Sequence, residues 1–218
     1  MTLNDISVKK YIALCGILKS NSYPDAIDRE VALLSCLTGK SEDFYLNLTL
    51  SELSKCSKEF DFIKLDTVEA KPTRFINANG KMYAPVYDFS KLSAGQFADA
   101  TYSLVMDAGD IIENIPKILA SICIPTKSGL FGRKLLKYGS IDRNTVIEDM
   151  EAASILDAYS IATFFRNAWD AFMINGGHLL ISEAIRKKDE AGTPFTGEEK
   201  AAMLVILEAY GDGVVRNK

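Results

Sequence analysis

Four helix starts in this sequence carry the capping-box pattern, and they constrain the fold more than any other feature. The pairs are Thr49 with Glu52, Ser93 with Gln96, Thr145 with Glu148, and Thr196 with Glu199. In each pair the hydroxyl accepts the amide proton of the third helical residue, and the acid or amide side chain reaches back to the cap. Each pair also opens a segment with apolar residues at helical spacing. The sequence therefore predicts a mainly helical fold.

Two earlier helices are indicated by apolar periodicity. Residues 7–19 carry a stripe of Val8, Ile12, Cys15 and Leu18, with Tyr11 and Leu14 beside it. Residues 26–38 carry Ile27, Val31, Leu34 and Leu37 at the same spacing, and Gly39 suits the left-handed conformation that ends many helices. A third helix, opened by Thr49, places Leu53, Cys56 and Phe60 on one face.

The middle of the chain has a different pattern. Residues 73–88 place β-forming residues on both sides of Asn79-Gly80, the strongest short signal for a two-residue hairpin turn. One hairpin is not stable by itself in water, so we expect it to pack on helices. After it, residues 93–107 and 108–125 predict an antiparallel helical pair, and residues 145–177 predict one long helix.

The predicted fold class is mainly α: a multi-helix domain with one small β-hairpin at about residues 73–88. We expect a single α-rich domain over residues 1–218, with a subdivision into N-terminal helices (1–64), hairpin (72–90) and helical bundle (91–218). A hydrophobic share of 48% and a charged share of 25% are ordinary for a globular protein.

Charge and cysteine usage exclude several classes of function. The net charge of −4 disfavours nonspecific binding to DNA or anionic lipid. The four cysteines form no CxxC pair, and we expect reduced, buried thiols in a cytosolic protein. The first twenty residues lack the pattern of a signal peptide. The longest apolar stretch, residues 155–174, is interrupted by charged residues, so we expect a core helix and no membrane span.

Candidate catalytic and metal sites have simpler structural interpretations. Thr38–Ser41 reads TGKS, but the glycine and the leading strand of a phosphate-binding loop are absent, so we interpret it as a helix end followed by a helix start. His178 is the only histidine, which excludes a multi-histidine metal site within one chain. Acids at Asp107, Asp110 and 148–151 are interpreted as helix N-terminal charges. We expect no catalytic residue, metal or cofactor.

A basic segment after Pro125 is the strongest candidate for a binding site. It contains Lys127, Arg133, Lys134 and Lys137, interleaved with Phe131 and Tyr138. An exposed basic loop with apolar anchors can dock on an acidic protein surface or on a nucleic-acid backbone. A solvated connector between helices is the alternative. A second candidate surface is aromatic: residues 164–173 cover more than one helix face, which fits a central helix or an oligomer interface.

Several segments together resemble a known class of proteins. They are VALLSCLTGKSEDF with LTLSELSK, the hairpin segment INANGKMYAPVYDFSKLSAGQFAD, and ENIPKILASICIP with the later FF pair. Over residues 27–172 this arrangement resembles structural or assembly proteins of tailed bacteriophages, particularly tail assembly chaperones and neck or tail components. The resemblance implies a nonenzymatic protein that binds other phage structural proteins (tail, neck or portal-associated) in the host cytoplasm during assembly or in the virion, with homo-oligomers allowed.

Two other functions stay open at this stage. One is a metal-dependent enzyme whose site assembles from scattered groups around Asp99, Glu113, Arg166 and His178, because carboxylates on neighbouring helices can bind a metal. The other is a small nucleic-acid-binding regulator that uses the basic segment, although the net acidity argues against it.

Overall fold

The computed structural model describes residues 2–23, 25–58, 73–88, 91–105, 111–129 and 132–172. The chain divides into two compact units, Met1–Thr163 and Phe164–Lys218. In the second unit the described residues, 164–172, are helical and continue a helix that begins at residue 155. The first unit is mainly helical with a small four-stranded antiparallel sheet, which confirms the predicted fold class.

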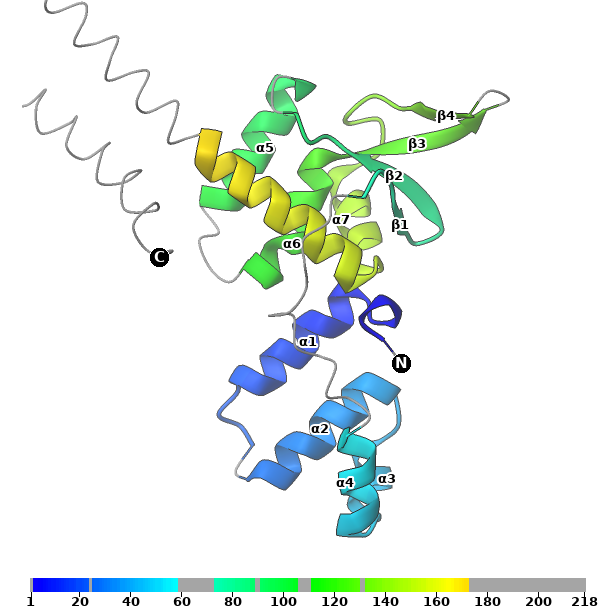
Figure 1. Ribbon diagram of the computed structural model, residues 1–218, viewed down its shortest axis with the longest axis vertical. Helices are drawn as coiled ribbons and strands as arrows, with labels where there is room; N and C mark the ends of the chain where they lie inside the picture. The colour runs from blue at the N-terminus through cyan, green and yellow to red at the C-terminus, as the bar shows by residue number, and fades with distance from the viewer. Residues whose placement is uncertain are drawn as a thin grey trace, which may run out of the picture. The chain divides into compact units, whose positions relative to one another are not determined.

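The N-terminal helices form a small cluster of their own within the first unit (Figure 1). They are the short 3-10 helix Leu3–Asp5, α1 (Val8–Lys19), α2 (Ala26–Thr38), α3 (Glu42–Leu46) and α4 (Leu50–Lys58). Helix α1 packs on α2, and α2 contacts α3 and α4. Helices α2, α3 and α4 share a core of Val31, Leu34, Tyr45 and Leu53, with Cys56 packed against it, and α1 also contacts α6 and α7.

Local signals at the helix ends are mostly confirmed. Gly39 has φ of 74°, and the hydroxyl of Ser41 accepts the amide proton of Phe44, so the TGKS segment does end one helix and begin the next. The capping boxes of Thr49 with Glu52 and of Ser93 with Gln96 are formed. The pair Thr196–Glu199 lies outside the described residues.

The prediction that Thr145 caps a helix is wrong. Helix α7 spans Arg143–Glu151, and its N-cap is Asp142, whose Oδ2 accepts amide protons from Asn144 at 3.0 Å and Thr145 at 3.2 Å. An aspartate is at least as good a cap as threonine, and it stands three residues earlier. The acids 148–151 therefore lie at the end of the helix and not at its start.

The sheet contains β1 (Ile76–Ala78), β2 (Lys81–Pro85), β3 (Cys123–Gly129) and β4 (Gly132–Leu135), in that order and all antiparallel. Asn79 and Gly80 turn between β1 and β2 with φ of 52° and 71°, which confirms the predicted hairpin. Tyr83 lies opposite Ile76 on one side and Pro125 on the other. Ile76, Ala78 and Tyr83 are buried on the face of the sheet that packs on α7.

The second hairpin, β3–β4, is a correction to the sequence-based expectation of helix up to Pro125 followed by a loop. Helix α6 (Ile111–Ile122) stops at Ile122, whose carbonyl accepts the amide proton of Val86, and the chain continues as a strand beside β2. Pairing with a distant strand overrides the local helical pattern here. Helix α5 (Ala94–Val105) packs on α6, as expected for the predicted helical pair.

The single long helix predicted over residues 145–177 is also wrong, because it is broken at residues 152–154. The extended backbone at Ser154 pairs with Ser7 in an isolated bridge. The amide of Val8 donates to the carbonyl of Ala153, and the amide of Ile155 donates to the carbonyl of Ile6, both at 2.9 Å. These long-range bonds join residues 6–8 to the break that separates α7 from the helix beginning at residue 155.

Candidate functional site

The basic segment predicted as a binding site is folded as the hairpin β3–β4, which we call the basic hairpin together with the following Lys137. In Figure 1 it reaches away from α5, α6 and α7. Lys127 lies on β3, Arg133 and Lys134 lie on β4, and all four basic side chains are exposed. The predicted site has two further residues, Phe131 and Tyr138. Of these, Phe131 lies outside the described residues.

The two lysines of the basic hairpin face each other. The register pairs Lys127 with Lys134 across the two strands, so their side chains project from the same face of the sheet. Like charges directly opposite on neighbouring strands destabilise the pair, typically by about 0.2–1 kcal/mol. Among the described residues, no carboxylate forms an ion pair with Lys127, Lys134 or Lys137. The basic hairpin therefore presents positive charge that the described part of the protein does not neutralise.

A cation–aromatic group that the sequence did not predict occupies the other face of the sheet. The guanidinium of Arg133 lies 6.0 Å from the ring centre of Phe75, and that of Arg74 lies 5.3 Å from the same ring. Arg74 and Phe75 immediately precede β1. Only the strand order, which no local pattern reveals, brings them to the same face as Arg133.

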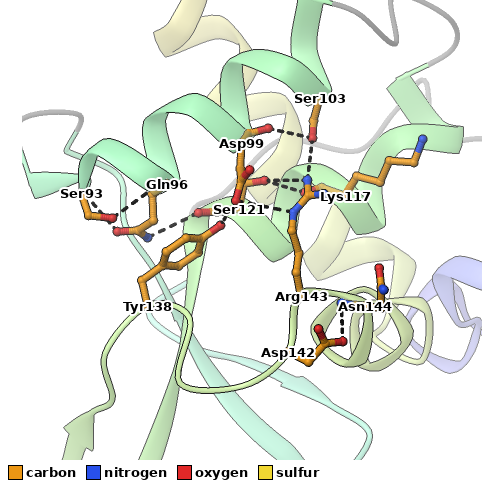
Figure 2. A network of polar contacts seen from close by, with 10 residues as sticks. All are labelled: Ser93, Gln96, Asp99, Ser103, Lys117, Ser121, Tyr138, Asp142, Arg143 and Asn144. Atoms are coloured by element: carbon orange, nitrogen blue, oxygen red, sulfur yellow. Dashed lines mark hydrogen bonds and ion pairs between the residues drawn. The ribbon is translucent and has the colours of Figure 1, made fainter.

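Tyr138 anchors the base of the basic hairpin. Its hydroxyl donates to Oδ2 of Asp99 on α5 at 2.5 Å (Figure 2). Burial, together with this bond and the negative charge of Asp99, raises the pKa of Tyr138 well above its usual value. The phenol stays protonated at neutral pH, which suits it to donate a hydrogen bond and not to act as a base.

Arg143 joins the same network from the first residue of α7 (Figure 2). Its Nε lies 3.7 Å from Oδ2 of Asp99, and its Nη2 donates to the hydroxyls of Ser103 at 3.3 Å and Ser121 at 3.5 Å. Ser121 stands on α6, so the network links α5, α6, α7 and the segment after β4. The side chains of this network mostly bind one another, but Nε of Arg143 is buried without a hydrogen-bond partner and only forms the ion pair with Asp99.

A pocket of about 260 Å³ opens beside this network. Its lining is Asp99, Ala120, Cys123, Pro125, Tyr138, Gly139, Ile141, Asp142, Arg143 and Val146. Burial raises the pKa of the Cys123 thiol far above its usual value, so the thiol stays protonated at neutral pH and is not activated as a nucleophile. The volume is at the small end for an organic ligand.

A second polar cluster lies under the β1–β2 turn. The carboxylate of Asp149 is 2% exposed and accepts hydrogen bonds from Asn79 at 2.9 Å, Lys81 at 2.7 Å and Tyr83 at 2.5 Å. Burial by itself would raise the pKa of Asp149, but the hydrogen bonds from Lys81, Tyr83 and Asn79 outweigh it and lower the pKa. The cluster fastens the first hairpin to α7.

The residues considered for a metal site are Asp99, Glu113, Arg166 and His178. Those that the structure describes do not share a common partner. Asp99 binds Tyr138 and Arg143, and Glu113 lies 3.4 Å from Lys19. Arg166 is exposed, and it belongs to the second unit. His178 lies outside the described residues. Within the part of the chain that the structure describes, no three acid, cysteine or histidine side chains come together in a way that could hold a metal ion.

Comparisons of the chain with protein-family models, with curated proteins and with solved structures find no match. Within the described ranges, no helix combines the length and the apolar character needed to cross a membrane.

Proposed function

We propose that this protein works without catalysis, by binding an acidic surface of another protein through its basic hairpin. The observation that carries the proposal is the cross-strand pair Lys127–Lys134, whose positive charges lie opposite each other with no carboxylate paired to them among the described residues. A carboxylate placed between the two lysines would convert this repulsion into attraction.

The charge balance of the chain favours a protein partner over nucleic acid. The sequence has 29 acids and 25 Lys and Arg, so the long-range field is repulsive to a polyanion, while the hairpin offers only a few local cations. Those few cations are enough to bind a discrete acidic patch on another protein. Electrostatic docking of this kind gives specificity and a fast association rate.

The phage resemblance over residues 27–172 supplies the biological setting of the proposal. We propose that the partner is another structural protein of a tailed phage (tail, neck or portal-associated), and that binding occurs in the host cytoplasm during assembly. The protein then either leaves as an assembly chaperone or stays as a virion component. A mass-spectrometric inventory of purified particles separates the two roles, since only a virion component is retained.

The experiment that tests the docking uses the partner found by co-purification with tail proteins or by that inventory. The triple variant Arg133→Gln/Lys134→Gln/Lys137→Gln should bind it about tenfold more weakly, since each exposed ion pair contributes a fraction of a kcal/mol. The control variant Lys55→Gln/Lys58→Gln neutralises exposed lysines on α4. Equal binding by the triple variant and the wild type would refute the proposal, and tight binding of nucleic acid by the wild type would replace it.

A further inference from the structure

Strand β4 forms one edge of the sheet, and the direction of its backbone groups follows from a single hydrogen bond. The amide of Leu136 donates to the carbonyl of Pro125 on β3 at 2.9 Å. In an antiparallel strand, successive residues point their N–H and C=O groups to opposite sides. Leu136 and Lys134 therefore face β3, whereas Arg133 and Leu135 point theirs away from the sheet.

These outward groups of β4 have no strand paired to them within the described ranges of the chain. Among the described residues β4 pairs only with β3. The side chain of Leu135 is 52% exposed, and those of Arg133 and Lys134 are exposed too. An edge with free backbone groups at every second residue is a template for strand addition.

The side chains along this edge define what can add to it. Lys134 and its neighbour Lys127 project from one face, and Arg133 and Leu135 project from the other. In the central register of antiparallel self-pairing, Lys134 of a second copy of β4 would lie opposite Lys134, and this like-charge pair disfavours self-pairing. An incoming segment gains most when it places acids opposite Arg133 and Lys134 and an apolar residue opposite Leu135.

We propose that an extended acidic segment of the partner protein adds to β4 as a fifth, antiparallel strand. This inference rests on the proposed function and gives it a binding mode. The backbone groups of Arg133 and Leu135 supply the main-chain hydrogen bonds, and the segment carries an apolar residue followed by two acids. Main-chain pairing supplies affinity, and the alternating side chains supply specificity.

The test measures binding of a fluorescent synthetic peptide that repeats Val-Asp-Glu to the full-length protein by anisotropy. A second peptide has the same sequence and charge but carries N-methyl groups on all of its backbone amides, which removes the donors for strand pairing along both of its edges. The wild-type protein should bind the N-methylated peptide about tenfold more weakly. Equal binding of the two peptides would overturn strand addition.

A pair of protein variants tests the same point from the other side. Leu135→Pro removes an amide that points away from β3, so the hairpin itself should persist, because proline is tolerated at such edge positions. Leu135→Ala removes the same side chain and keeps the amide. The proline variant should bind the unmodified peptide about tenfold more weakly than the alanine variant, with unchanged circular dichroism. If the two variants bind alike, strand addition is excluded.

The outcomes separate this inference from the proposed function. If the triple charge variant loses partner binding while Leu135→Pro and the N-methylated peptide behave like their controls, the hairpin docks by side chains alone, and only the strand addition fails. If neither set of changes matters, both proposals fail. Competition by oligothymidylate as strong as that by the peptide would also overturn the inference, because a phosphate backbone needs no outward amide.

Discussion

The hydroxyl of Tyr83 on β2 donates a 2.5 Å hydrogen bond to the buried carboxylate of Asp149 on α7, across 66 positions of sequence. Tyr83 is fully buried, and Asp149 is its acceptor. Lys81 and Asn79 bind the same carboxylate, so one acid holds the β1–β2 turn, the strand and the helix together.

Removing that acid should destabilise the protein strongly. Asp149→Ala leaves the buried Tyr83 hydroxyl without its acceptor and should lower the free energy of unfolding by about 3 kcal/mol. The control is Glu148→Ala, an exposed acid on the same helix, which should change it by no more than about 0.5 kcal/mol. Urea unfolding followed by circular dichroism compares the two. Similar midpoints for both variants would mean that the cluster is not an anchor.

The Asp149 carboxylate should also make the free energy of unfolding fall as the pH is lowered. The folded-state pKa of Asp149 lies below the usual value of 3.8, so its contribution is fully present above about pH 5 and is lost as the pH falls through the lowered pKa. The difference in unfolding free energy between the wild type and Asp149→Asn should therefore be largest at neutral pH and should shrink as the pH falls below about 4. A difference that is constant with pH would contradict this assignment, because the other acids are common to both proteins.

Elements specified by neighbouring residues could be predicted from the sequence. The Asn79-Gly80 turn, the left-handed Gly39 and the capping box at Thr49 all depend on contacts within a few residues. The break at residues 152–154 and the strand β3 could not be predicted, because they depend on pairing with Ser7 and with β2. The basic side chains of the candidate site were visible in the sequence. The alignment of Lys127 with Lys134 was not, since a register is set by the whole sheet.

Helix α1 provides a direct test of a periodic pattern against the structure. The sequence pattern included Leu18 in the apolar stripe, but its side chain is 53% exposed, whereas that of Leu14 is 1% exposed. Leu14→Ala should lower the free energy of unfolding by about 2–5 kcal/mol and Leu18→Ala by about 0.5 kcal/mol or less. Chemical denaturation measures both. Equal effects would favour the sequence pattern over the observed packing.

The start of α7 allows a similar comparison. Asp142→Ala removes the acceptor for two backbone amides and should destabilise the protein by about 1 kcal/mol. Thr145→Ala, at the position that the sequence pattern assigned to the cap, should have almost no effect, because alanine is the better helix former inside the first turn. Thermal unfolding of the two variants shows which substitution destabilises the protein more. The reverse order would place the helix start at Thr145.

We propose that the cations of the basic hairpin serve a partner and not the fold. The most direct measurement takes Lys127→Gln/Lys134→Gln beside Lys55→Gln/Lys58→Gln and determines both the Tm and the affinity for the co-purified partner. We expect the hairpin variant to keep or slightly raise its Tm, because a like-charge pair is removed, and to bind the partner about tenfold more weakly, while the control binds like the wild type. A hairpin variant that binds as tightly as the control, or that unfolds at a clearly lower temperature, would contradict it.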